Sequence, residues 1–224
     1  MTGVESLYPF LYAGDSARMR AEMFAEVVES TKAKLAESER VRAELVRVDA
    51  HRIAGCAAAM AARFAAGGQL FSFGNGGSST DADAVAELFV RPGPAASGPR
   101  PRRLPARSLT ADVATLTALA NDVSFDVVFA RPLAAAGGAG DIAFGLSTSG
   151  SSTNVLAGLA EAHRIGMLTV GLAGYSGGAM AEARDRGQID HLFVMPSDSV
   201  HRIQEAQTTT YQVLWELVQL ALGR

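Results

Sequence analysis

Five short apolar runs, separated by longer stretches of helical character, constrain the fold of this chain most strongly. The runs are Gln69–Phe73, Leu104–Leu109, Asp141–Leu146, Leu168–Ala173 and His191–Met195. They lack the regular alternation of a half-exposed strand, which indicates strands that are buried on both faces. Helices are predicted over 112–120, 155–165 and 201–222. The pattern predicts an α/β fold, a three-layer sandwich with a central parallel sheet.

An N-terminal helical extension precedes the first strand. Between Asp15 and Ala66 there is no proline and only one glycine, Gly55, and apolar residues recur at helical spacing. We predict two long helices over about 16–66, the second ending at Gly67-Gly68. Residues 1–15 are interpreted as a tail, and 16–224 as a single domain that includes both helices.

Composition excludes several classes of protein. The chain has 20 Lys and Arg against 23 Asp and Glu, so no overall charge attracts it to nucleic acid or to a membrane surface. A single cysteine, Cys56, excludes a disulfide framework and a zinc ribbon. No apolar run approaches the ~20 residues that span a bilayer, and the N-terminus lacks the pattern of a secretory signal. We expect a cytoplasmic protein.

The segment from Arg91 to Arg107 stands apart, with five prolines, five arginines and no acidic residue. We interpret it as a solvated connector. The alternative is an anion-binding or partner-binding site, or a cover for the active site of a neighbouring subunit.

Two glycine- and serine-rich loops follow predicted strands. The first is Gly74-Asn75-Gly76-Gly77-Ser78, and the second is Ser147-Thr148-Ser149-Gly150-Ser151-Ser152. At the carboxyl ends of parallel strands, such loops present backbone N–H groups, hydroxyls and a helix N-terminus to an anion. Each alone is explained by a tight turn with a helix cap. The two together favour a phosphorylated small molecule.

These loops, with the AND sequence ending at Asp122 and the RIQE sequence beginning at Arg202, resemble the sugar isomerase (SIS) domain, and within it the phosphoheptose isomerase family. The resemblance covers about residues 16–222. It implies the three-layer sandwich and a homotetramer with active sites between subunits. It also implies interconversion of a ketose phosphate and an aldose phosphate, here sedoheptulose 7-phosphate and heptose 7-phosphate, through an enediol.

The resemblance assigns residues to the substrate. The phosphate is expected on Ser147, Thr148, Ser149 and Ser152. The sugar chain is expected on Asn75, Gly76, Gly77, Ser78, Asn121 and Asp122. Gln204 corresponds to a family glutamine that contacts both the substrate and the metal.

The catalytic positions depart from the family. Matching the AEL sequence makes Glu87 the base and requires a one-residue gap, whereas an ungapped match places Leu88 there. The two family zinc histidines correspond to Asp83 and Gln212.

The matched metal set is therefore Asp83, Glu87, Gln204 and Gln212. The resemblance implies a divalent metal, zinc in the family, but this hard, oxygen-rich set would not suit zinc as two imidazoles do. His201 is the candidate that would supply the missing general acid. The alternative function is a non-catalytic SIS protein that binds a sugar phosphate or a protein partner.

Overall fold

The computed structural model describes residues 16–93 and 100–223. The predicted tail 1–15 and positions 94–99 of the Arg/Pro segment lie outside the described residues. Contacts divide the chain into two parts, residues 1–40 and 41–224; the second part holds the sheet, residues 41–65 of the long N-terminal helix and all the later helices.

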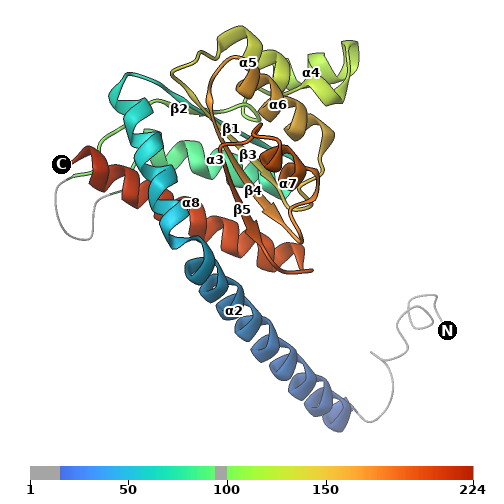
Figure 1. Ribbon diagram of the computed structural model, residues 1–224. Helices are drawn as coiled ribbons and strands as arrows, with labels where there is room; N and C mark the ends of the chain where they lie inside the picture. Colours follow the sequence, from blue (N-terminus) through green and yellow to red (C-terminus); the bar gives the residue numbers. More distant parts are fainter. Residues whose placement is uncertain (1–15, 94–99, 224) are drawn as a thin grey trace. The chain divides into compact units, whose positions relative to one another are not determined.

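A five-stranded, all-parallel sheet forms the middle layer of this second part, in the order β2-β1-β3-β4-β5 (Figure 1). The strands are β1 (Leu70–Gly74), β2 (Ala106–Ser108), β3 (Ile142–Ser147), β4 (Leu168–Gly174) and β5 (His191–Met195). All five predicted strands and their parallel arrangement are confirmed. Four of them are entirely or mostly buried, which explains their continuous apolar sequences.

Helices cover both faces of the sheet. They are α2 (Ser16–Ala65), α3 (Gly77–Val90), α4 (Val113–Asp122), α5 (Ala130–Ala136), α6 (Thr153–Arg164), α7 (Gly178–Asp185) and α8 (Val200–Leu222), with a short 3-10 helix η2 (Phe125–Val127). The sequence did not predict η2, α5 or α7. Each has at most eight residues, too few for helical periodicity to show.

The prediction of two N-terminal helices is wrong. A single helix, α2, runs for 50 residues without interruption. Gly55 lies within it and costs only about 1 kcal/mol relative to alanine, so it does not end the helix. The predicted end is confirmed: Gly67 has φ +89°, and the Gly68 amide donates to the Arg63 carbonyl.

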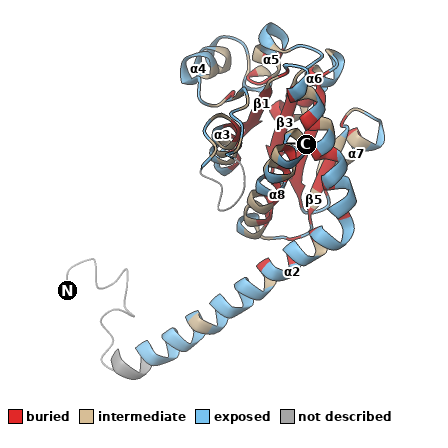
Figure 2. Cartoon of the chain, turned by 90° about the vertical axis from the view of Figure 1, so that its left-hand side faces the viewer, coloured by how far each residue is buried: buried red, intermediate tan, exposed pale blue. Residues whose placement is uncertain are grey.

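Two apolar cores lie on the two faces of the sheet, and Figure 2 shows the buried residues concentrated in the strands and in the helix faces against them. On one face of the sheet, residues 41–64 of α2 pack together with α3 and α8. They cover strand residues that include Leu70, Ile142, Phe144 and Val170. Residues of α5, α6 and α7 pack on the other face, against Phe71 and its neighbours. Side chains alternate between the two faces along each strand.

The order of the strands in the sheet changes direction between β1 and β3. This switch point indicates where a ligand would bind. From β1 the chain passes to β2 on one side and later returns to β3 on the other. In open parallel sheets, ligands bind at such a switch point, outside the carboxyl ends of the strands. The two loops singled out in the sequence follow β1 and β3 and lie at this point. Among the described residues, no helix is long and apolar enough to cross a membrane.

Candidate functional site

Residues 147–152, at the end of β3 and in the loop that follows it, bring several hydroxyl groups together. We call this segment the cradle. The Ser147 hydroxyl lies 2.9 Å from that of Ser152 and 3.4 Å from that of Ser149. Ser152 is the N-cap residue of α6, yet its side chain makes no capping hydrogen bond. The hydroxyls therefore converge on one another at a helix N-terminus, an arrangement suited to a phosphate. A simple capping role does not account for Ser152.

The cradle is held from outside by the first turn of α7 and by Gly177, the residue before it. The Met180 amide donates to the Gly150 carbonyl at 2.8 Å, and the Ala179 amide donates to the Ser151 hydroxyl at 3.2 Å. Gly150 has φ +65°, and a Cβ there would lie 2.1 Å from the Gly177 carbonyl oxygen. Only glycine fits at this position, and the close approach fixes the shape of the cradle.

The loop after β1 is linked to the first turn of α6, next to the cradle, by a pair of side-chain amides. Asn75 and Asn154 exchange two hydrogen bonds, of 2.7 and 2.9 Å, between their side chains. Asn154 is buried in the first turn of α6 and was not singled out in the sequence. Gly76 has φ +54°, and α3 begins directly at Gly77, while Ser78 is buried. The structure thus places both predicted loops side by side.

Gln204 reaches this loop from the first turns of α8. Its amide nitrogen lies 2.4 Å from where a Cβ of Gly77 would be, so the glycine leaves the space that Gln204 occupies. The same nitrogen donates to an oxygen of Asp81 at 3.2 Å. Gln204, which was expected to contact the substrate and the metal, thus lies beside the first loop.

Asp81 is a carboxylate that sequence analysis missed. Besides Gln204, it accepts a hydrogen bond from the Tyr211 hydroxyl at 3.3 Å, and Tyr211 also contacts Thr208. Burial raises the pKa of Asp81, although the hydrogen bonds from Gln204, Tyr211 and Thr208 oppose the change. Burial likewise raises the pKa of the Tyr211 hydroxyl, which stays protonated at neutral pH.

The residues matched to the metal site have other partners. Asp83 is exposed and accepts a hydrogen bond of 2.9 Å from Thr110. The Glu87 side chain is 59% exposed and lies 3.8 Å from the Arg91 guanidinium. Gln212 and Glu87 line one surface hollow with Tyr211.

This set does not fit zinc. Within residues 16–93 and 100–223, no three His, Cys, Asp or Glu side chains gather into a possible metal site. Both matched carboxylates have partners within the chain, and the two glutamines supply only neutral amide oxygens. The groups that could act on a substrate here are therefore the chain's own side chains.

The remaining predicted residues lie at helix ends. His201 is exposed in the first turn of α8. Asn121 and Asp122 end α4, where the Asn121 amide donates to the Asp122 carboxylate at 2.7 Å.

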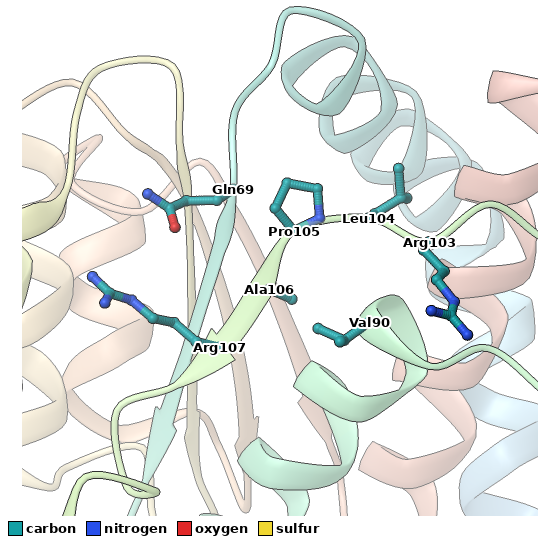
Figure 3. Close-up of a pocket in the computed structure, with 7 residues that line it drawn as sticks. All are labelled: Gln69, Val90, Arg103, Leu104, Pro105, Ala106 and Arg107. Carbon is teal, nitrogen blue, oxygen red and sulfur yellow. The ribbon is translucent and has the colours of Figure 1, made fainter.

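The described part of the Arg/Pro segment lies at the opposite end of the sheet. Residues 103–107 line a hollow with Gln69 and Val90, at the amino ends of β1 and β2 (Figure 3). The guanidinium of Arg107 covers the Phe71 ring at 4.5 Å, and the Arg103 side chain points away from it. The two cations do not converge on one site, and residues 100–105 form the predicted irregular connector.

Comparison with known proteins identifies relatives over nearly the whole chain. A family model described as the SIS domain matches residues 35–174. Phosphoheptose isomerase from Aquifex aeolicus is 39% identical over 194 residues, which are 86% of this chain and 96% of that protein. The enzyme of the same name from Desulfovibrio desulfuricans is 41% identical over 207 residues, or 92% and 83% of the two chains.

Solved structures agree with the sequence relatives. The phosphoheptose isomerase from Francisella tularensis superposes with a TM-score of 0.78 and 30% identity, over 87% of this chain and 98% of that one. The enzyme from Neisseria gonorrhoeae gives a TM-score of 0.76 and 31% identity, over 86% and 98%. The chain belongs to the SIS domain family and, within it, to the family of the phosphoheptose isomerases.

Proposed function

We propose that this protein is a sugar-phosphate isomerase that interconverts sedoheptulose 7-phosphate and heptose 7-phosphate. The observation that carries the proposal is the cradle, in which three hydroxyls converge at the N-terminus of α6 at the switch point of the sheet. The relatives that bear the name phosphoheptose isomerase support the choice of substrate.

The cradle would bind the phosphate through Ser147, Thr148, Ser149 and Ser152. The macrodipole of α6 favours the negative charge there. The sugar chain would then extend toward the neighbouring Gly74–Ser78 loop and Gln204, because the Asn75–Asn154 pair joins the two loops.

Isomerisation through an enediol needs two proton movements. A base takes a proton from the carbon next to the carbonyl and returns it to the former carbonyl carbon, while the oxygen on the first carbon loses a proton and the former carbonyl oxygen gains one. Glu87 is the base predicted by resemblance, and His201 the predicted acid. Both side chains are exposed in the isolated chain.

We also propose that the active protein is a cytoplasmic homotetramer. Large apolar side chains remain exposed on α2 and α8, including Val46, Val48, Val213 and Leu220, and such residues are suited to subunit contacts. The chain's single cysteine is compatible with a reducing compartment.

The test is direct turnover of sedoheptulose 7-phosphate by the purified full chain, with added zinc and with a chelator. The Ser152→Ala variant should bind the substrate roughly 10- to 150-fold more weakly, because a hydrogen bond to a charged group contributes roughly 1.5–3 kcal/mol. Thr117→Ala, an exposed hydroxyl change on α4, is the matched control.

Turnover by the wild-type chain supports the isomerase. Binding of the sugar phosphate without turnover would instead assign the chain to the non-catalytic SIS proteins. Turnover that falls with the chelator and returns with zinc would contradict the derivation of the chemistry from side chains alone.

A further inference from the structure

Asp81 is the carboxylate of α3 that accepts hydrogen bonds from α8, whereas Glu87 lines a surface hollow with Tyr211 and Gln212 of that helix. The helix is regular from Gly77 to Val90 and packs against α8. At about 100° per residue, Leu88 lies within roughly 20° of Asp81 around the helix axis, whereas Glu87 is rotated by about 120°. The AEL match to Glu87 requires a gap, and no irregularity in α3 absorbs one.

The surroundings of Asp81 hold its side chain in a defined position. One carboxylate oxygen accepts from Gln204 at 3.2 Å, and the other accepts from Tyr211 at 3.3 Å. Both donors come from α8, which lies more than 120 residues away in the sequence. Gln204 in turn occupies the space left by Gly77 in the first loop.

We propose that Asp81 is the general base of this chain, oriented by hydrogen bonds from Gln204 and Tyr211 and placed beside the sugar-binding loop. The proposal rests on the isomerase function proposed above and replaces Glu87 in the role of base.

The reaction balances without a further reactant. The Asp81 carboxylate takes the proton from C1 of the ketose, the C–H electron pair forms the C1–C2 double bond, and the carbonyl electrons move to O2, which is protonated. The resulting enediol loses the O1 proton and re-forms a carbonyl at C1. Asp81 then returns its proton to C2. The proton balance at the two oxygens is maintained through water.

The chemistry of Asp81 suits this role better than that of the other carboxylates on α3. Asp81 is half-buried and both of its oxygens accept hydrogen bonds from α8, whereas Asp83 and Glu87 are exposed. The Glu87 carboxylate lies 3.8 Å from a guanidinium, and Asp83 is held by Thr110 on the exposed side of the helix.

The test compares Asp81→Asn with the wild-type full chain. We measure kcat and KM for sedoheptulose 7-phosphate, exchange of the C1 proton with deuterated solvent, and the unfolding temperature. We expect kcat and proton exchange to fall by about 10²–10⁴-fold, with substrate binding retained. Asp185→Asn, which makes the same change at an exposed carboxylate of α7, is the matched control and should turn over like the wild type.

A second variant separates catalysis from folding. Asp81→Ala leaves a gap beside Gln204 and Tyr211, and added formate should restore part of its turnover, which a merely structural role would not allow. Should Asp81→Asn fail to fold, this rescue still tests the proposal.

The outcomes distinguish the two proposals. If the wild type turns over and Asp81→Asn keeps its rate and its proton exchange, the assignment of the base is overturned and the isomerase stands. Loss of exchange in Glu87→Gln, with exchange retained in Asp81→Asn, would give the role to Glu87. If the wild type itself has no turnover, the isomerase and the base assignment fall together.

Discussion

The cradle and the α3–α8 contact are two halves of one proposed active site, and they are built in different ways. The cradle consists of six consecutive residues, and its hydroxyls contact one another within five positions, although the Ser151 hydroxyl also accepts from the Ala179 amide of α7. The α3–α8 contact joins Asp81 to Gln204 and Tyr211, over 123 and 130 positions of sequence. One half is local, and the other depends on the packing of two helices.

The two halves also differ in how well they would tolerate a side chain in place of a glycine. In the cradle, glycine backbone lies against glycine backbone at Gly150 and Gly177, so there is no side chain that can yield. In the α3–α8 contact, the neighbour of Gly77 is the end of the flexible Gln204 side chain. In the proposed site, a rigid local loop would therefore bind the phosphate, while adaptable side chains would perform the proton transfer.

The largest effect is expected from Gly150→Ala. The new Cβ would lie 2.1 Å from the Gly177 carbonyl oxygen, and φ +65° is strained for alanine. We expect a loss of about 2–4 kcal/mol in the free energy of unfolding, from overpacking and from the left-handed backbone. Disruption of two charged hydrogen bonds to the phosphate would raise KM by roughly 100-fold or more. Chemical denaturation and steady-state kinetics measure the two effects.

Gly187→Ala is the control for backbone strain alone. Gly187 has φ +73°, but no atom lies within 4 Å of its missing Cβ. We expect a loss of about 1 kcal/mol and an unchanged KM. Equal losses in the two variants would mean that the close approach to Gly177 has no role in holding the cradle.

A smaller effect is expected from Gly77→Ala, the matching change in the other half. The Cβ would meet the Gln204 amide at 2.4 Å, and this side chain can move aside. We expect stability to change by less than about 1 kcal/mol, while turnover falls by roughly 10-fold because Gln204 no longer orients Asp81. Gly55→Ala, in the interior of α2 with open space around it, should keep full turnover and gain about 0.5–1 kcal/mol. Full turnover in Gly77→Ala would show that the orientation of Gln204 does not matter.

The contrast between the two halves explains what could be predicted from the sequence. Both loops were predicted, because strand, glycines, hydroxyls and helix start are consecutive. Asp81 was missed because its significance depends on which side of α3 faces α8. Tyr211 was not singled out either, since the partner of its hydroxyl lies on another element.

The same contrast between local and long-range contacts explains what could be predicted of the fold. Each buried strand was predicted from its own short apolar run. The N-terminal region was divided into two helices because a 50-residue helix is unusual, although nothing between Ser16 and Ala65 ends it. Asn154 could not be found as the partner of Asn75, because the two are 79 positions apart and meet only when β1 and β3 pair.

The smallest expected effect is the pH dependence of the stability of Asp81→Asn relative to the wild type. It tests whether burial of the Asp81 carboxylate in the α3–α8 contact costs stability. Since burial raises the pKa of Asp81 in the folded chain, the native state holds this proton more tightly than the unfolded chain, where the pKa is about 3.9. The wild type therefore loses stability as pH rises from that value through the folded pKa, whereas the asparagine variant has no proton to lose there.

The unfolding temperature of Asp81→Asn relative to the wild type should accordingly rise between acidic and neutral pH and then level off. Tyr211, the titratable side chain that faces Asp81 from α8, remains protonated over this range because burial raises its pKa as well. Thermal unfolding at a series of pH values measures the difference. A relative stability that falls toward neutral pH would mean that the ionised carboxylate stabilises the fold, as expected of a structural hydrogen-bond acceptor. A relative stability that rises, in a variant that has lost turnover, is what a base held in the folded chain at a cost in stability would produce.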